Sequence, residues 1–417
     1  MMKLRVIAAS SFVWLATGVL AAQSAPPKPT PTLEEKLGDV RYELHVEGRK
    51  FSGNGAPVLA SAIADARYVL IGEDHLTREI PQFADGICGL MGDAGPFTMV
   101  VEASPEVAAF VAASLGKPDG ERHMAELQRQ YPDSVAFLNM RQEYELVQDC
   151  AASTQGRGFQ LWGLDQPFLG SAGWLLDQIL ATHPGPNATK VITALKKKEE
   201  SDAMLAQQTG DPLKLLLVSA DGAELEKARG VLQREGSSTA RALLEGLIES
   251  RNIYLKNLSG HAPESNEQRA RMLKRRLSEK LQAVGGVQKI LIKFGDSHVY
   301  KGVNEIEQRD LGNYVAEIAD AAGATSLHVC VRGAKGVHAG YGGYNRPLKH
   351  EPFTQIEDDP WMNPVVENQV ESGWTLYDLR KLRFHKIENV SADMRRMIDG
   401  YDLLVIIPEL TPGDEIE

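Results

Sequence analysis

The chain has 417 residues, of which 24% are charged and 43% are hydrophobic, and its formal net charge at pH 7 is −11. This length is sufficient for one large domain or two ordinary domains, each with its own core. The acidic balance argues against nucleic acid as a partner, and so does the lack of a basic stripe interleaved with aromatic residues.

The N-terminal segment has the pattern of a secretory signal peptide. Two basic residues precede an apolar stretch at residues 6–20, and small residues follow it. The stretch is short and is followed by a cleavage site, which argues against a membrane anchor. We therefore expect residues 1–22 to be removed and residues 23–36 to form a Pro-rich linker. The mature protein is expected to be secreted or periplasmic, with no stable membrane anchor.

After the linker, short apolar runs alternate with helical patterns. After the first run, apolar residues repeat at helical spacing over residues 80–91, with Thr77 placed to cap the helix. After the second run, Ser104 and Pro105 are typical of a helix start. The alternation predicts an α/β fold with a mostly parallel sheet flanked by helices. The predicted strands cover residues 68–71, 97–102, 159–164, 289–294, 325–331 and 403–407.

One long stretch interrupts the alternation. Residues 169–286 show only helical patterning, and we interpret them as a large all-helical insertion above the carboxyl edge of the sheet. The insertion divides the α/β core into a first part, residues 37–168, and a second part, residues 287–417. Near the end of the chain, the glycine-rich residues 333–344 are expected to form a mobile loop, because they carry no P-loop pattern.

A signature of glycine, an acid, any residue and histidine occurs twice, each time after a predicted strand. Gly-Glu-Asp-His stands at residues 72–75 and Gly-Asp-Ser-His at residues 295–298. Glycine at the first position is expected to let the chain turn sharply. Because ligands of parallel sheets bind beyond the carboxyl ends of the strands, the two signatures are expected to share one polar site.

Carboxylates and imidazoles from four strand ends are expected to meet at this site. Such groups perform general acid–base catalysis, because burial and neighbouring charges move their pKa values apart. Asp165 has an equally good interpretation as a helix cap, and Asp74 is expected to face solvent or cap a helix. The candidate catalytic residues are Glu73, His75, Glu102, Asp165 and His298. The same chemistry suits a divalent metal, whose candidate ligands are Glu73, His75, Asp296 and His298.

A nucleophilic side chain has less support than an activated water. No Gly-x-Ser-x-Gly motif occurs, which disfavours an α/β-hydrolase mechanism. The three cysteines leave two alternatives open. Cys88 and Cys150 pair in an oxidising compartment and leave Cys330 as a single thiol, or all three are small buried residues.

These residues resemble motifs of a superfamily that comprises erythromycin esterase-like enzymes, Tiki/TraB metalloproteases and ChaN-like haem-binding proteins. Residues 72–75 look like the Gly-Glu-x-His of the ChaN-like members, and residues 295–298 resemble the second Gly-x-x-His of the Tiki group. Other pieces are similar to the esterase branch. Residues 75–79 are similar to its His-Gly-Thr-x-Glu segment, and residues 163–165 are similar to its Gly-Leu-Asp. Glu102 lies where that branch has a glutamate after the second strand.

The chain also departs from the esterase branch. That branch places two residues between its glutamate and histidine, whereas only Asp74 separates Glu73 from His75. An arginine-bearing helix of that branch is matched only in part by residues 268–272.

We therefore predict an exported hydrolase that cleaves an ester, lactone or peptide bond of a small-molecule or peptide substrate, with or without a divalent metal. In this interpretation His75 is the general base or a metal ligand, and His298 is its partner. Glu73 and Glu102 orient the water or bind the metal, and Asp165 or Asp296 fixes an imidazole tautomer.

The alternative is a periplasmic protein of the ChaN-like type that binds haem or a metal without catalysis. A haem site needs mainly an axial ligand and an apolar slot. Hydrolysis is favoured because the predicted site has more acids and histidines than a haem site requires.

Overall fold

The computed structural model describes residues 30–285 and 288–417. The predicted signal peptide, residues 1–22, and residues 23–29 of the predicted linker lie outside the described residues. The last residues of that linker, 33–36, lie in α1 (Leu33–Val40), whose start is capped by Thr32. Among the described residues, no helix is both long and apolar enough to cross a bilayer.

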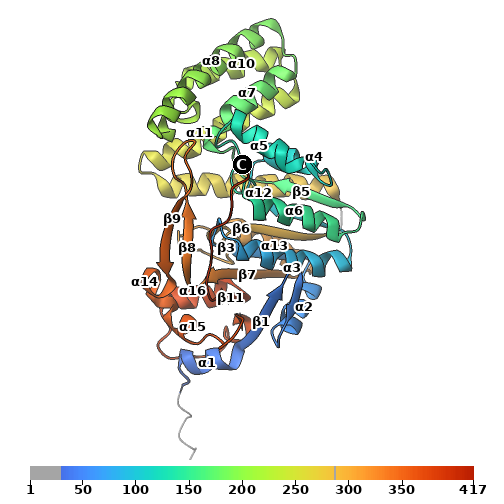
Figure 1. The fold of residues 1–417 in the computed structure, drawn as a ribbon, viewed down its shortest axis with the longest axis vertical. Coiled ribbons are helices and arrows are strands. Elements are labelled where there is room, and N and C mark those ends of the chain that lie inside the picture. Colours follow the sequence, from blue (N-terminus) through green and yellow to red (C-terminus); the bar gives the residue numbers. More distant parts are fainter. Residues whose placement is uncertain (1–29, 286–287) are drawn as a thin grey trace, which may run out of the picture.

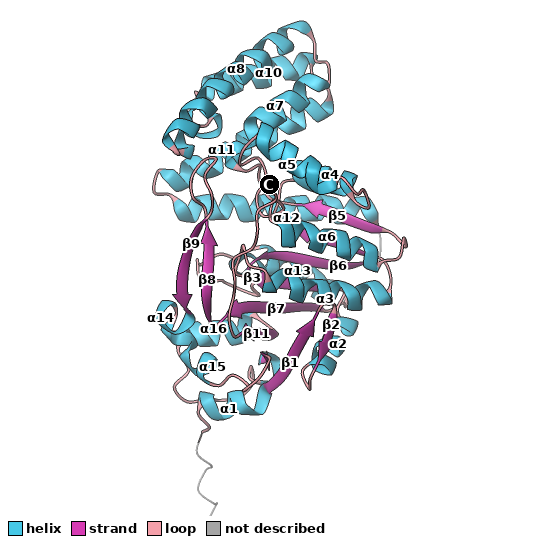
Figure 2. Ribbon diagram, viewed as in Figure 1, coloured by secondary structure: helices cyan, strands magenta, loops and turns pink. Residues whose placement is uncertain are grey.

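Nine strands form one mostly parallel sheet, which confirms the predicted fold class (Figures 1 and 2). All six predicted strands are present, as β3, β4, β5, β6, β7 and β11, and they run parallel to one another. Antiparallel pairing adds three further strands at one edge. The spatial order is β2 (Lys50–Ser52), β1 (Arg41–Glu47), β10 (Trp374–Asp378), β11 (Leu403–Ile407), β7 (Ser326–Gly333), β3 (Tyr68–Glu73), β6 (Lys289–Gly295), β4 (Phe97–Val101) and β5 (Phe159–Gly163).

Alternate side chains of the central strands pack into two hydrophobic layers. In β3, Val69 and Ile71 belong to one layer and Tyr68 and Leu70 to the other, because successive side chains of a strand point to opposite faces. The first layer contains α2 (Ala56–Asp65), α3 (Glu79–Ala94), α4 (Pro105–Ser114), α5 (Gly120–Gln130) and α6 (Arg141–Ser153). The second contains α1, α13 (Leu311–Ala321), α15 (Asn363–Glu367) and α16 (Ala392–Gly400).

The described residues between β5 and β6 form only helices and loops. Figure 1 shows α7, α8 and α10 stacked at one end of the molecule, beyond the β5 edge of the sheet. From there the chain returns through α12, which packs in the second layer of the sheet. The helices are α7 (Ala172–Ala181), α8 (Pro186–Thr209), α9 (Leu216–Ser219), α10 (Gly222–Glu235), α11 (Ser238–Leu258) and α12 (Ala262–Val284).

A two-stranded sheet stands where we predicted a mobile loop at residues 333–344. β8 (Lys335–Gly340) pairs antiparallel with β9 (Lys349–Thr354). The loop that joins them contacts the helical region, since the Tyr344 amide donates to the carbonyl of Gly210 over 3.1 Å. The hairpin therefore links the sheet to the helical region.

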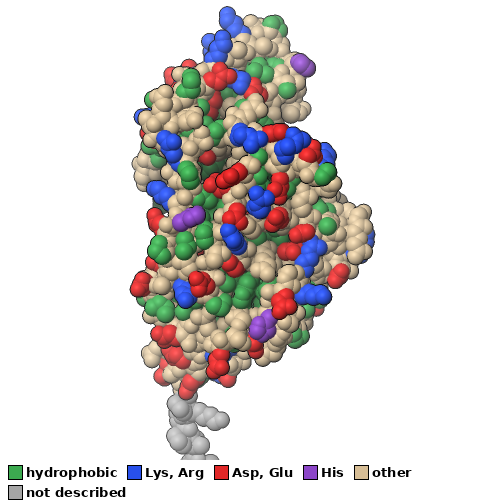
Figure 3. All heavy atoms as spheres, in the orientation of Figure 1, with side chains coloured by type: hydrophobic (Ala, Val, Ile, Leu, Met, Phe, Trp, Pro, Cys, Tyr) green, Lys and Arg blue, Asp and Glu red, His purple; other side chains and the backbone are tan. Residues whose placement is uncertain are grey.

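Local details near the sheet differ in how well the sequence predicted them. Ser104 caps α4 as predicted, and its hydroxyl accepts from the amide of Val107. Thr77 does not cap α3, which starts at Glu79 without a side-chain cap. Cys88 on α3 and Cys150 on α6 form a disulfide, and Cys330 is a buried thiol. Acidic and basic side chains are interspersed over the face shown in Figure 3.

Candidate active site

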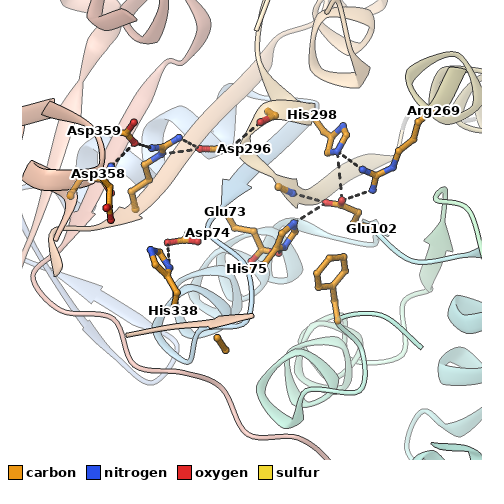
Figure 4. Close-up of a pocket in the computed structure, with 16 residues that line it drawn as sticks. Glu73, Asp74, His75, Glu102, Arg269, Asp296, His298, His338, Asp358 and Asp359 are labelled. Carbon is orange, nitrogen blue, oxygen red and sulfur yellow. Dashed lines mark hydrogen bonds and ion pairs between the residues drawn. The ribbon is translucent and has the colours of Figure 1, made fainter. Parts of the chain in front are cut away.

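A cavity of about 710 Å³ opens at the carboxyl ends of the central strands. Both Gly-acid-x-His signatures contribute to its lining, together with the end of β4 and the end of β7. The hairpin and α14 (Gln355–Asp358) close the opposite side. Figure 4 shows that the cavity has two halves, one around Glu102 and one around Asp296.

Glu102 joins the two signature histidines. Its Oε2 atom lies 3.4 Å from Nε2 of His75, and its Oε1 atom lies 3.6 Å from Nε2 of His298. The Gly295 amide donates to Oε2 over 2.6 Å. The nearby cations hold the pKa of Glu102 well below its usual value despite burial. The structure thus brings both imidazoles to a single ionised carboxylate.

His75 lies between two carboxylates. Its Nδ1 atom is 2.9 Å from Oε1 of Glu73, on the side opposite Glu102. Phe137 stacks on the imidazole, with ring centroids 4.1 Å apart. Burial disfavours the charged ring, but Glu102 and Glu73 outweigh it and raise the pKa of His75 to about 10. At neutral pH the free site therefore holds an imidazolium.

The signature glycines provide space rather than a turn. Gly295 has a φ of −51°, which any residue can adopt, so the expected reason for this glycine is wrong. A Cβ atom at this position would lie 2.7 Å from Nε2 of His75. A Cβ atom at Gly72 would lie 2.5 Å from the hydroxyl oxygen of Tyr401. Any side chain at position 295 would therefore displace His75.

Arg269, which was not among the predicted site residues, occupies the centre of the site. It lies on α12, and its Nε donates to Asp165 over 2.9 Å. Its Nη2 donates to Glu102 over 2.6 Å, and its Nη1 lies 3.0 Å from Nε2 of His298. Asp165 is therefore a partner of Arg269 and not of an imidazole. The partial likeness of residues 268–272 to the esterase helix was the signal that pointed to this arginine.

Asp310 holds His298. Its Oδ2 lies 2.8 Å from Nδ1 of the imidazole, and its Oδ1 accepts from the amide of Leu311 at the start of α13. The acid that fixes this imidazole is thus Asp310, where we expected Asp165 or Asp296. Burial and Arg269 lower the pKa of His298, but Glu102 and Asp310 outweigh them and raise it overall.

A buried lysine supports Glu73 from below the cavity. Lys293 on β6 has a side chain that is 2% exposed, and it bonds to Glu73 and, over 2.6 Å, to Glu143 on α6. Burial raises the pKa of Glu143 to about 7. Burial acts on Glu73 too, but Lys293 and His75 outweigh it and lower the pKa of that carboxyl. Glu73 is therefore the stronger acid of the two.

The second half of the cavity has its own ion pairs. Arg332 donates from Nε to Asp296 over 2.8 Å and from Nη1 to Asp359 over 2.8 Å. Asp74 lies 3.1 Å from Nδ1 of His338 on β8 and lines the cavity, whereas we expected it to face solvent or cap a helix. Asp296 is thus held by Arg332, and Figure 4 shows its carboxylate apart from the group formed by Glu102, His75 and His298.

The predicted metal ligands do not fit a metal site. Glu73 is bound to Lys293, and Asp296 is bound to Arg332. His298 is held by Asp310 and Arg269. Over residues 30–285 and 288–417, no group of three or more His, Cys, Asp or Glu side chains is arranged to hold a metal ion. We therefore assign no chemical step to a metal.

Comparisons with solved structures find the predicted fold in known proteins, at sequence identities of 13% and 14%. No family model matches the chain, and no curated protein matches its sequence. A variant of erythromycin esterase EreC in its open conformation is similar, with a TM-score of 0.63 and 13% identity over 90% of this chain and 99% of that chain. A succinoglycan biosynthesis protein has a TM-score of 0.56 and 14% identity over 92% of this chain and 98% of that chain. A protein from Bacillus cereus has a TM-score of 0.57 and 14% identity over the same shares of the two chains.

Proposed function

We propose that the protein is a hydrolase that cleaves an ester, lactone or peptide bond with an activated water. The observation that carries this proposal is the contact of one carboxylate, Glu102, with both His75 and His298 in a large cavity. Two imidazoles beside one acid can take a proton from water and return one to a leaving group. The fold shared with erythromycin esterase agrees with this chemistry.

His75 is the proposed general base. Glu73 holds Nδ1, which leaves Nε2 to face Glu102. Because Nε2 and the Glu102 oxygen are 3.4 Å apart, one water molecule can contact both atoms. His75 in its neutral form takes a proton as the water oxygen bonds to the carbonyl carbon, and Glu73 stabilises the imidazolium that results.

Arg269 and His298 are proposed to complete the reaction. A guanidinium has five N–H donors, and the contacts to Asp165 and Glu102 engage three of them. A protonated His298 cannot accept from Arg269, so an N–H of Nη1 is available to stabilise the negative charge on the carbonyl oxygen. His298 in its protonated form gives its proton to the leaving oxygen or nitrogen as that bond breaks.

We also propose that the mature protein works outside the cytoplasm. The N-terminal residues follow a signal-peptide pattern. The disulfide between Cys88 and Cys150 agrees with export, because such bonds persist in oxidising compartments. The N-terminal sequence of protein recovered from cell fractions tests the cleavage.

The haem-binding alternative has less support. Acidic and basic side chains line most of the cavity, whereas a haem group needs an apolar slot beside its axial ligand.

Hydrolysis by the purified protein over a panel of esters, lactones and peptides tests the proposal. His75→Gln should lower kcat/KM by roughly 10²–10⁴-fold, the usual contribution of a general base. His123→Gln is the matched control, since His123 lies on the surface in an ion pair with Asp119. A panel without hydrolysis, together with a haem absorption band that His75→Gln removes, would favour the binding protein instead.

A further inference from the structure

A second, smaller cavity of about 190 Å³ adjoins the main cavity. The two cavities share Glu102, Phe137 and Arg269 in their linings. A substrate whose scissile bond lies at His75 is therefore held next to the smaller cavity. We propose that this side cavity binds a small, uncharged apolar group on one side of the scissile bond, such as a phenyl ring or a branched alkyl group. This inference rests on the proposed hydrolase function.

The lining of the side cavity suits an uncharged group. Apart from the shared residues and Asp165, its walls are uncharged: they combine the apolar side chains of Ala103, Val107, Ala136 and Phe168 with the polar side chains of Ser104, Ser134, Gln166 and Tyr254. Its charged members are engaged with one another, since Arg269 is bound to both Asp165 and Glu102. Burying a further charge beside these completed pairs would be costly. The cavity therefore selects apolar groups over ionic ones.

The size of the side cavity limits the group that it admits. A cavity of about 150 Å³ is sufficient for benzene in another protein. The side cavity of about 190 Å³ therefore admits one ring or a compact alkyl group, whereas the main cavity of about 710 Å³ takes a much larger group. The main cavity is lined with charged side chains, so the two parts of the substrate differ in both size and polarity.

Aromatic residues fix the walls of the side cavity. Phe137 forms part of both linings and stacks on His75. The backbone φ of Phe137 is 62°, which is uncommon for a bulky residue. This conformation costs free energy that contacts with the surrounding residues must offset. Phe168 packs edge-to-face against Tyr341, whose hydroxyl donates to Asp133 over 2.8 Å. The apolar pocket is thus preformed beside the proposed base.

Matched esters and two variants, in each of which phenylalanine replaces an alanine, test the side cavity. Of the two cavities, Ala136 lines only the side cavity, whereas Ala339 lines only the main cavity. We expect methyl phenylacetate or benzyl acetate to exceed methyl acetate in kcat/KM by roughly tenfold or more, measured by acid release. Ala136→Phe should abolish this preference, and Ala339→Phe should preserve the ratio. The inference is overturned if Ala136→Phe leaves the ratio unchanged or if both variants lower it equally.

Binding of benzyl alcohol separates this inference from the proposed function. If none of the esters is hydrolysed, the hydrolase proposal fails, and the side cavity is judged by NMR titration of the protein with benzyl alcohol. Resonances of residues around Phe137 and Phe168 should shift in the wild type and not in Ala136→Phe. No shift in the wild type, or the same shift in both proteins, would contradict an apolar subsite.

Discussion

The Oε2 atom of Glu102 lies 3.4 Å from the Nε2 atom of His75, although the two residues follow strands that are not neighbours. β6 lies between β3 and β4, and its last residue, Gly295, leaves the space in which the two side chains meet. The Gly295 amide also donates to Glu102. The site therefore depends on the ends of three adjacent strands and on one position without a side chain.

The rate of hydrolysis should rise as the pH increases above neutrality, until His298 loses the proton that it gives to the leaving group. Glu102 and Glu73 raise the pKa of His75 to about 10, and a general base acts in its unprotonated form. Each pH unit below that pKa therefore lowers kcat/KM by about tenfold. The wild-type pH profile measures this slope. In Glu102→Gln, which removes one of the two carboxylates, the rise should occur at lower pH. A wild-type rate that does not rise as the pH increases above neutrality would assign the proton transfer to another group.

Lys293→Met should destabilise the fold strongly. The substitution leaves Glu73 and Glu143 buried beside each other without their common cation, and such a loss costs about 3–5 kcal/mol. Urea unfolding measures the free energy of unfolding. Arg122→Met removes a cation from exposed ion pairs and is the control, with an expected cost within about 1 kcal/mol. Equal effects of the two substitutions would show that Lys293 does not support Glu73.

Arg269→Lys should reduce activity without unfolding the protein. A lysine keeps the charge but loses the planar fork that reaches Asp165, Glu102 and His298 together. Loss of a donor to the carbonyl oxygen should lower kcat/KM by roughly 10²–10³-fold. Arg271→Lys on the exposed side of the same helix is the control. Wild-type kcat/KM in Arg269→Lys would remove the guanidinium from the reaction.

Removal of metal ions should leave hydrolysis unchanged. The carboxylates of Glu73 and Asp296 are already paired with Lys293 and Arg332, respectively. Activity before and after dialysis against a chelator measures the dependence. Loss of activity that an added divalent ion restores would contradict this expectation and support the metal ligands predicted from the sequence.

The sequence predicted the parallel strands and missed the antiparallel ones. β3 is buried along its whole length, so its apolar run is continuous. β1 has mainly half-exposed residues, and β9 is mostly exposed, so neither forms an apolar run. The hairpin of β8 and β9 is formed by backbone pairing between segments that carry little hydrophobic signal. Residues 335–340 were therefore interpreted as a loop.

The site was predictable only where local sequence carried the signal. His75, Glu102 and His298 each stand at or just beyond the end of an apolar strand, and the structure brings all three together. Arg269 and Asp310 come from a helix and from a loop, and their approach depends on tertiary packing. Asp296 shares its signature with His298 but is directed to Arg332, because the signature does not specify the side-chain direction.

A double-mutant cycle of His75→Gln and His298→Gln tests most directly whether the two histidines act in one site. Residues that act as a unit have strongly non-additive effects on kcat/KM. We predict that the double variant hydrolyses the best ester of the panel no more slowly than the more damaged single variant. Effects on kcat/KM that multiply, or a His298→Gln variant with wild-type activity, would contradict a shared catalytic site around Glu102.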